Sequence, residues 1–541
     1  MSNNELTLNR AQVRSILTPA PIEVDLWGRG TGKSTLIGFH SQRTVHFFPR
    51  CTPIMLGVTY SSMLTITLAE VVGTWERLGY REGIHFMVRK KPPAKWGWPK
   101  PLHAPVSYDN FIAWYNGSGF YLASQDAGAP FRGGNGHGLY ADEAALLDKT
   151  KLDEQVRPAI RGDYEYFKRH PLLHFEKYTS SKPIGDRGKW LEQMGSYYQD
   201  EGFHFDLITQ RMVDLKTKFV IEPDRLAKQQ LWHEIIQLKK QLTWHRSRDG
   251  VFYNEADGFD NIKNLGAKWF AKQKKLSSPI KFRVEVLNET MRAAEASFYP
   301  AFSELRHCYF DTDNHSYLSS LELSHRDQHE RTSLWDSDVV HDAPLRIAAD
   351  FGGSFNCIVV WQRHRDTIRI INVFWVKPPQ ILDHVFAHFA EYYRHHKNKQ
   401  VLFWYDRTGN NAKDNSTLTS AQQATQVLQG YGWAVRRMTK GRAPHHEVKF
   451  RDANRVLLAE DPTLPRVLIN GNRCKNLVTS ILLSPLVMGA RGEHKDKRNE
   501  TKDHYPQEDA THLSDVFDII IEAEISGASN TTSTPDMMVL G

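Results

Sequence analysis

The 541-residue sequence predicts an α/β chain in two parts, and three observations support this prediction. A glycine-rich segment, residues 28–35, lies between a short apolar run and a helical pattern. Later in the same half, a second apolar run ends in two acids, at 142 and 143. In the second half, Asp350, Asp406 and Asp515 each lie in or at the edge of an apolar segment. The first two features are typical of a phosphate-binding parallel sheet, and the third of a carboxylate metal site.

The glycine-rich segment has the sequence Gly-Arg-Gly-Thr-Gly-Lys-Ser-Thr. Residues 22–26 are predicted to form a strand and residues 33–40 the start of a helix, so the turn between them exposes backbone N–H groups to a phosphate at the positive end of the helix. Lys33 is expected to reach the β- and γ-phosphates of ATP, and Ser34 to hold Mg²⁺. The candidate nucleotide-binding residues of the loop are Arg29, Gly30, Thr31, Gly32, Lys33, Ser34 and Thr35.

Two features of this loop depart from the Walker A pattern. Trp27 stands where the pattern has a glycine, and Glu23 and Asp25 interrupt a strand that should be apolar. The alternative interpretation is a glycine-rich surface turn that precedes Gly-Lys-Ser-Thr by chance.

The acidic pair gives the loop a possible partner. A strand that ends in two acids places Asp142 beside the Mg²⁺ and Glu143 beside the attacking water, as its base. An acidic pair at a helix start is otherwise a cap. Arg132, in the loop 130–134, is either an arginine finger or a solvated charge, and Arg29 is a second candidate for contact with the γ-phosphate. Residues 173–178 predict a strand ending at Thr179, which would sense hydrolysis unless the segment is a plain turn.

The second half predicts a strand, a hairpin, a helix, a strand and a late helix. The predicted ranges are a strand at 345–349 ending at Asp350, hairpin strands at 358–361 and 368–376, a helix at 379–396, a strand at 401–405 ending at Asp406, and a helix at 512–523 containing Asp515. This is the element order of RNase H-like nucleases, where carboxylates from separate elements converge on two divalent cations. Such hard oxygen ligands favour Mg²⁺ or Mn²⁺.

Each aspartate also has a plainer interpretation. Asp350 could be a turn former at a strand end. Asp515 could be an exposed helix residue, with Asp518 replacing or assisting it one turn later. His512, three residues before Asp515, could orient the site or simply cap or pack the helix.

Together, the motifs and their order resemble the large terminase subunit of tailed bacteriophages. The matching segments are Arg29 to Ser34, Arg132-Gly133, Asp142-Glu143-Ala144, Thr179-Ser180, the aromatic cluster at 298–302, and Thr-His-Leu-Ser-Asp at 511–515. The resemblance implies an α/β chain with a P-loop ASCE-type ATPase domain built on a parallel sheet, plus an RNase H-like nuclease domain.

The resemblance also implies a viral DNA-packaging motor. In that role ATP hydrolysis, with Mg²⁺, drives double-stranded DNA through a portal protein into an empty capsid, and a nuclease with two Mg²⁺ or Mn²⁺ ions cuts concatemeric DNA. The implied partners are DNA, the portal protein, a small terminase subunit and further copies of the chain in a ring of five. The implied place is the host cell cytoplasm during assembly, not the mature virion. A helicase- or repair-type ATPase with an appended nuclease, and a metal-dependent nuclease with a regulatory nucleotide site, remain alternatives.

The motifs place an ATPase domain at 1–205, a charged and mainly helical lid and linker at 206–340, a nuclease domain at 341–525 and a disordered Ser/Thr/Asn-rich tail at 526–541. The charged segment 486–506 is expected to lie over the nuclease site. The tryptophan-rich residues 95–99 predict a loop on the ATPase domain with no assigned role.

Composition agrees with these predictions without deciding between them. The chain has 69 Lys and Arg against 62 Asp and Glu, a net charge of +7 that permits contact with DNA. Basic clusters at 394–399, 436–442 and 491–502 could bind the DNA backbone or be solvated faces. Four cysteines without metal-ligand spacing indicate a reducing compartment, and no segment predicts a signal peptide or a membrane span.

Overall fold

The computed structural model describes most of the chain in two compact units. The described residues run from 7 to 529, apart from 19, 126–134, 163, 168–169, 171–172, 184, 202–207, 209–210, 213, 216–217, 220–221, 247–249, 278–281, 290–296, 322–329, 353–354, 411–417, 439–443, 490–491 and 502–504. The first unit comprises residues 1–274 with 279–291 and 318–328, and the second comprises the rest. Each unit is described by itself.

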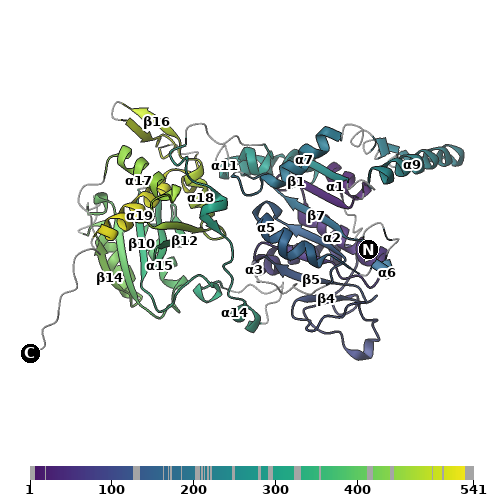
Figure 1. The fold of residues 1–541 in the computed structure, drawn as a ribbon, viewed down its shortest axis with the longest axis horizontal. Helices are drawn as coiled ribbons and strands as arrows, with labels where there is room; N and C mark the ends of the chain where they lie inside the picture. Colours follow the sequence, from purple (N-terminus) through teal and green to yellow (C-terminus); the bar gives the residue numbers. More distant parts are fainter. Residues whose placement is uncertain are drawn as a thin grey trace, which may run out of the picture. The chain divides into compact units, whose positions relative to one another are not determined.

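The first unit is built on an eight-stranded sheet (Figure 1), in the order β3-β4-β5-β2-β6-β7-β1-β8. Its strands are β1 (Ile22–Trp27), β2 (Ile54–Gly57), β3 (Phe86–Val88), β4 (Phe111–Trp114), β5 (Gly119–Ser124), β6 (Gly138–Asp142), β7 (Phe175–Ser180) and β8 (Val251–Ala256). The pairs β3–β4 and β4–β5 are antiparallel, and all other neighbours in the sheet are parallel. A parallel sheet of this kind brings the carboxyl ends of its strands to one edge.

The strand order confirms the fold class predicted for the first half. β7 lies between β1, which precedes the glycine-rich loop, and β6, which ends at Asp142. One strand therefore separates the loop from the acidic pair, as in P-loop ATPases of the ASCE type. β8 pairs with β1 although it falls within 206–340, so the sheet draws one strand from the segment that the sequence assigned to the lid and linker.

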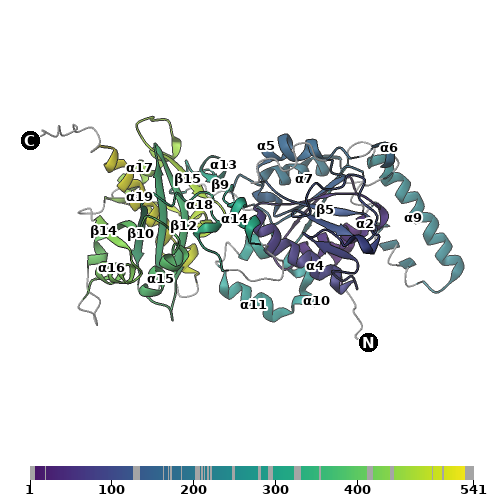
Figure 2. The same cartoon turned by 90° about the horizontal axis from the view of Figure 1, so that it is seen from below.

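Helices cover both faces of this sheet (Figure 2). Glu23 of β1 contacts Ser15 of α1 and His40 of α2, whereas Tyr178 of β7 packs on Trp190 of α7, so α1 and α2 lie on the face opposite α7. The helices of this unit are α1 (Arg10–Leu17), α2 (Lys33–Phe47), α3 (Tyr60–Ser62), α4 (Leu68–Arg77), α5 (Lys149–Lys151), α6 (Tyr164–Phe167), α7 (Lys189–Glu201), α9 (Arg225–Arg246) and α10 (Ile262–Leu265). Two further helices, α11 (Ala267–Leu276) and α14 (His315–Ser320), include residues of both units.

The second unit contains a seven-stranded sheet in the order β14-β13-β10-β11-β12-β15-β9. Its strands are β9 (Cys308–Tyr309), β10 (Leu345–Phe351), β11 (Asn356–His364), β12 (Thr367–Val376), β13 (Gln400–Tyr405), β14 (Ala434–Met438) and β15 (Arg466–Asn470). β10, β11 and β12 form an antiparallel meander, while β13 pairs parallel to β10 and β14 parallel to β13. This is the strand order of RNase H-like folds, and it confirms the class predicted for the second half. A separate hairpin joins β16 (Leu486–Gly489) and β17 (Gly492–Lys495).

Alternation along β10 decides which helices cover which face of this sheet. Leu345 and Ile347 point into the main core with α15, whereas Arg346 bonds to Glu524 of α19 on the opposite face. Figure 2 shows α15 and α16 on one side of the sheet and α19 on the other. The helices are α13 (Glu304–His307), α15 (Leu382–Tyr392), α16 (Ser420–Gly430), α17 (His446–Leu458), α18 (Lys475–Leu482) and α19 (His512–Ser529).

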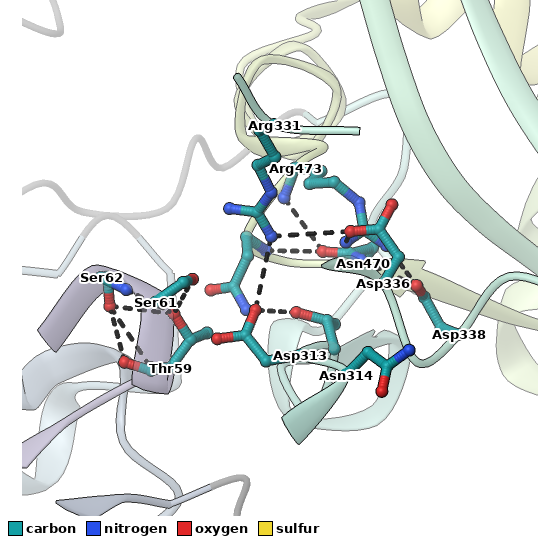
Figure 3. Close-up of polar contacts among 12 residues, drawn as sticks. Thr59, Ser61, Ser62, Asp313, Asn314, Arg331, Asp336, Asp338, Asn470 and Arg473 are labelled. Atoms are coloured by element: carbon teal, nitrogen blue, oxygen red, sulfur yellow. Dashed lines mark hydrogen bonds and ion pairs between the residues drawn. The ribbon is translucent and has the colours of Figure 1, made fainter. Parts of the chain in front are cut away.

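A buried charge network ties the segment before β10 to this sheet (Figure 3). Arg473, which follows β15, donates from Nη1 to Asp336 at 2.5 Å and from Nη2 to Asp338. Asn470 of β15 donates to Asp338 at 2.8 Å, and Arg331 lies 3.4 Å from Asp313. Burial raises the pKa of Asp336 to about 6 although the guanidinium of Arg473 opposes the change. The network fixes the segment that carries Asp336 and Asp338 against β15, a fold role for these charges.

The four cysteines, Cys51, Cys308, Cys357 and Cys474, are all free and buried. Among the helices in the described part of the chain, none has the length and apolar character that a bilayer crossing requires.

Candidate active sites: the phosphate loop and the aspartate edge

The loop between β1 and α2 has the backbone of an anion site. Gly30 and Gly32 adopt left-handed conformations, with φ of 85° and 84°, which glycine reaches without strain. Gly32 is the N-cap of α2, and no side chain caps the helix there. The N–H groups of the first turn of α2 therefore remain available to a phosphate.

Four amide side chains hold the carbonyls of this loop; we call them the amide collar. Each donates one hydrogen bond to a carbonyl of the loop or of β1. The bonds are Asn9 to Thr31 (2.7 Å), Gln12 to Gly32 (3.0 Å), Asn261 to Gly30 (2.7 Å) and Asn288 to Leu26 (2.6 Å). The backbone N–H groups of Gly28 and Arg29 donate to the carbonyls of Ala256 and Glu285. The collar and these bonds together fix the loop that leads into the first turn of α2.

Lys33 and Thr31 use their side chains inside the loop. The ammonium of Lys33 donates to the carbonyl of Trp27 at 2.9 Å and to the hydroxyl of Ser181 at 3.0 Å. Burial lowers the pKa of Lys33, while Glu143 and Asp142 act in the opposite direction. The hydroxyl of Thr31 is buried and donates to the carbonyl of Gly28 at 2.7 Å, so it braces the loop itself. Ser34 and Thr35 lie half-buried in the first turn of α2.

The acidic pair ends β6 two strands away. Asp142 is buried and accepts hydrogen bonds from the hydroxyls of Thr67 (2.8 Å) and Thr179 (2.9 Å). Burial, and then the charge of Glu143, raises the pKa of Asp142. Glu143 has a left-handed backbone, with φ of 50°, and its residue is exposed, so the two acids point into different surroundings. Thr67 had no sequence signal, because it meets Asp142 only through the fold.

The two candidate arginines differ in what the structure describes. Arg29 is more than half exposed and forms an ion pair with Glu285 at 3.0 Å. Arg132 lies outside the described residues, and its role stays a prediction.

The departures from the Walker A pattern have a packing explanation. Trp27 is fully buried, donates from its indole N–H to the carbonyl of Asn254 at 3.1 Å, and packs beside Ala11 and Leu36. Its side chain therefore fills the core beneath the loop, where a glycine would leave space.

The two acids of β1 are paired rather than exposed. Glu23 accepts from Lys177 of β7 and lies 3.5 Å from His40 of α2; we call these three residues the β1 charge cluster. Burial favours the neutral form of Glu23, but Lys177 and His40 outweigh it and hold its pKa well below the usual range. Asp25 accepts from Asn254 at 3.0 Å, and burial raises its pKa.

The second site lies where β10 and β13 end. Ala349 is in register with Tyr405 in this parallel pair, so Asp350 and Asp406 follow at the same edge on neighbouring strands. Asp350 contacts Nδ1 of His512 at 2.9 Å, and the other ring nitrogen lies 3.0 Å from Gln507. Burial lowers the pKa of His512, but Asp350 outweighs burial and the net direction is upward. The first turn of α19 therefore meets the same edge.

Asp515 follows in α19 and is neutralised by lysines of the hairpin region. Its carboxylate accepts from Lys495 at 2.8 Å and from Lys497. Burial alone would raise the pKa of Asp515, but the two ammonium groups outweigh it and hold the pKa well below the usual value. Asp518 is buried and accepts from Tyr299 at 2.6 Å and from Lys495 at 2.8 Å. Lys495 and Lys497 belong to the basic cluster 491–502 and to the charged segment 486–506, although no pattern in the sequence singled out either lysine.

The donors of this aspartate edge suit a hard divalent cation, since they are carboxylate oxygens. Among the residues that the structure describes, no three His, Cys, Asp or Glu side chains are already gathered as a metal site. Asp350 and Asp406 thus offer carboxylate oxygens at the ends of β10 and β13. The carboxylate of Asp515 in α19 is engaged by Lys495 and Lys497 as counter-ions.

The two strand orders define an ASCE-type P-loop fold joined to an RNase H-like fold. No protein-family model matches the chain, and no curated protein matches it. Among solved structures, it is similar to the large terminase from a thermophilic bacteriophage, with 11% identity, 96% of this chain and 100% of that chain covered, and a TM-score of 0.37.

Two single-domain structures match parts of the chain. The ATPase domain of the large terminase of Thermus phage P74-26 shows 15% identity over 53% of this chain and 94% of that chain, with a TM-score of 0.31. The large terminase nuclease domain from bacteriophage SPP1, solved with bound Mn, shows 15% identity over 34% of this chain and 87% of that chain, with a TM-score of 0.22. These likenesses are to the family that the sequence motifs resemble, and the fold class itself rests on the strand orders.

Proposed function

We propose that this chain is the large subunit of a viral DNA-packaging terminase. The observation that supports the proposal is the combination of two sites in one chain. One is a glycine-rich loop separated from an acidic pair by a single strand, and the other is two aspartates at the ends of adjacent parallel strands. A nucleotide-driven motor accounts for the first site, and a nuclease that cuts the transported DNA accounts for the second.

In the first site, Lys33 and the N–H groups of the first turn of α2 bind the phosphates of ATP. Ser34 and Asp142 hold the Mg²⁺ that accompanies the nucleotide, and this ion supplies charge neutralisation at the phosphates when bound. Glu143 orients and deprotonates the attacking water. Thr179 bonds Asp142, and Ser181 bonds Lys33, so the end of β7 contacts both sides of the site and is suited to respond to hydrolysis. Arg29 or Arg132 supplies the additional positive charge.

In the second site, Asp350, Asp406 and Asp515 hold two Mg²⁺ or Mn²⁺ ions. When bound, the ions supply activation of water and stabilisation of charge at a scissile phosphate. His512 orients the carboxylate of Asp350 through the 2.9 Å contact. The partners in this proposal are double-stranded DNA, a portal protein, a small terminase subunit and a ring of five copies of the chain. The place of action is the host cell cytoplasm during virion assembly.

The ATPase part is tested by substituting Lys33 and Glu143 separately. Lys33→Ala should lose both nucleotide binding and turnover, because Lys33 contacts phosphate in every state. Glu143→Gln should lose turnover but keep binding, because it acts on water. Phosphate release with duplex DNA and binding of a fluorescent ATP analogue measure the two effects, with Lys149→Ala, an exposed lysine, as control. Full turnover in Glu143→Gln would refute the assignment.

The nuclease part is tested by plasmid cleavage with Mg²⁺ or Mn²⁺. Asp350→Asn and Asp406→Asn should end cleavage, while Asp366→Asn, in the exposed β11–β12 turn, should leave it intact. Cleavage that persists in both edge variants would contradict the site. Strand separation without a portal would instead favour a helicase- or repair-type enzyme, and absence of ATP turnover with DNA and portal would favour a nuclease with a regulatory nucleotide site.

A further inference from the structure

Most of the segment between β3 and β4 carries positive charge and no acidic residue before Asp109. From residue 83 to residue 108 the sequence contains no Asp or Glu, whereas Arg89, Lys90, Lys91, Lys95 and Lys100 fall within it. We call residues 89–101 the basic loop. Its four lysines are exposed, and none of them forms an ion pair with a residue that the structure describes. A cluster of unpaired ammonium groups creates a local positive potential.

The backbone of the basic loop is restrained by prolines, a left-handed glycine and two hydrogen bonds to neighbouring segments. Prolines at 92, 93, 99 and 101 restrict its backbone, and Gly97 takes a left-handed conformation with φ of 65°. The carbonyl of Lys100 accepts from Arg50 at 3.0 Å, and Arg89 donates to the carbonyl of Asp109 at 2.7 Å. The backbone of the loop therefore has little conformational entropy left to lose on binding.

A pair of indole rings lies among the lysines. Trp96 and Trp98 are half-buried, and their ring centroids are 5.1 Å apart at an interplanar angle of 41°. Flat aromatic surface next to positive charge is typical of surfaces that contact nucleic acid. Protein interfaces, in contrast, are depleted in Lys. The composition of the loop thus favours a polyanion over an acidic protein.

We propose that the basic loop binds the phosphodiester backbone of DNA, without reading sequence. The choice of DNA rests on the proposed function, while the charge and geometry of the loop identify the phosphate chemistry. Lys90, Lys91, Lys95 and Lys100 neutralise phosphates as point charges, and the indole pair supplies apolar contact beside them. The loop thereby acts as a DNA contact of the first unit separate from the phosphate loop.

The test compares three sets of variants in the full-length chain. The first replaces the four loop lysines by Gln, the second replaces the same four by Arg, and the third is a charge-matched control on the exposed lysines of α10 and α11, Lys263→Gln, Lys268→Gln, Lys272→Gln and Lys275→Gln. Binding to a duplex of about 30 base pairs, long enough to offer more phosphates than the loop has lysines, and to a single strand of equal length is measured without nucleotide at several salt concentrations. ATP hydrolysis without DNA serves as the folding control.

The Gln set should reduce the slope of log affinity against log salt by about 3 to 4 on the duplex, since each lost phosphate contact removes about 0.9. The Arg set should restore the slope, and the control set should keep the slope of the unsubstituted chain. Hydrolysis without DNA should be the same in all sets.

Three results would overturn the proposal. The first is an unchanged slope in the Gln set, and the second is an equal loss in the control set, which would indicate only net charge. The third is a Gln set that binds DNA as the unsubstituted chain does but binds poly-glutamate more weakly, which would identify an acidic protein as the partner of the basic loop. A change on the single strand alone would place the contact on unpaired DNA and sustain the phosphate assignment. Absence of ATP turnover in the unsubstituted chain would refute the proposed motor without affecting these binding results.

Discussion

Trp27 shows how a P-loop tolerates a residue outside its consensus. In the consensus, this glycine precedes the part of a P-loop that binds phosphate. Here the side chain of Trp27 turns into the core beneath α1 and α2. Gly30 and Gly32 still supply the left-handed backbone that the loop needs. The amide collar holds the carbonyls of the loop in place through side chains from other segments of the chain.

Restoring the consensus glycine should therefore harm the protein. Trp27→Gly removes a fully buried indole, and we expect a loss of about 4 kcal/mol in the free energy of unfolding. Chemical denaturation measures this loss, with Trp232→Ala, a half-exposed tryptophan of α9, as a control of much smaller effect. Stability equal to that of the unsubstituted chain would contradict the packing role of Trp27.

His40 predicts a specific pH dependence. Burial and then Lys177 lower the pKa of His40 to about 4, although Glu23 acts in the opposite direction. The unfolded chain takes up this proton near its ordinary pKa of about 6.5, so the contribution of His40 lowers stability as pH drops from there to about 4 and is constant below that pH. The loss attributable to His40 is about 3 kcal/mol, at about 1.4 kcal/mol per pKa unit.

Denaturation curves of the unsubstituted chain and His40→Gln, recorded from about pH 7 to about pH 4.5, check this expectation. The variant should show the shallower pH dependence of the two. Parallel curves would show that other groups, and not His40, respond to acid in this range.

Removing carboxylates from the aspartate edge should have opposite effects on stability. Asp350→Asn should raise or preserve the metal-free melting temperature, because neighbouring acids repel one another. Asp515→Asn should lower it, because Lys495 would lose a partner while its own side chain is fully buried. Thermal melts in EDTA test the contrast, and equal shifts in both variants would contradict the ion pairs of Asp515.

Sequence patterns identified the candidate site residues that are marked by the residues next to them in the chain. Lys33, Asp142, Asp350 and Asp406 could be singled out because each stands at the junction of an apolar run and a turn. Thr67, Lys495, Lys497 and the amide collar could not be, since each meets its site only after distant segments fold together.

At the scale of elements, one carboxylate near the C-terminal end of α19 adds a clamp to the buried apolar contacts of this helix. Glu524 is 5% exposed and accepts from Arg346 at 2.5 Å, from Trp361 at 2.8 Å and from Arg363 at 3.1 Å. Because α19 also carries His512 and Asp515, this clamp positions one side of the aspartate edge from the other end of the helix.

Breaking the clamp should be costly. Glu524→Ala leaves two guanidinium groups and an indole N–H without their acceptor, and we expect about 3–5 kcal/mol of destabilisation. Asp461→Ala, which removes an exposed ion pair with Arg455, provides the control and should leave the unfolding midpoint almost unchanged. Similar midpoints for both variants would show that the clamp contributes no more than a surface pair.

Apolar periodicity predicted the strands and helices that carry the candidate site residues to within a few residues. The hairpin predicted between 358–361 and 368–376 is confirmed, since β11 ends at His364 and β12 begins at Thr367. β7 begins two residues later than predicted and includes Thr179. β9, with two residues, and β8, beyond a long helix, were not predicted, because edge strands of this kind depend on pairing with distant segments and have weak local patterns.

At the scale of the whole molecule, the two candidate sites belong to different compact units with separate cores. Motif order predicted this division, but the exchange of segments such as 318–328 between units has no signature in local sequence. The domain boundaries at residues 205, 340 and 525 remain predictions.

Each activity should therefore survive loss of the other. Lys33→Ala should abolish ATP hydrolysis but keep plasmid cleavage with Mn²⁺, and Asp406→Asn should do the reverse. Measuring both reactions in both variants completes the comparison. Loss of cleavage in Lys33→Ala, with a normal melting profile, would indicate that nucleotide binding controls the nuclease.

The four buried thiols provide a native probe of local opening in each unit. Because the four thiols are buried, a thiol-specific reagent reaches them only while the surrounding structure is open. Burial also raises the pKa values of Cys51, Cys357 and Cys474, which keeps these thiols unreactive in the closed state. Cys51 belongs to the first unit, and Cys308, Cys357 and Cys474 belong to the second. Labelling rates at these native positions therefore follow the opening of the two units separately, within one chain that needs no engineered probe.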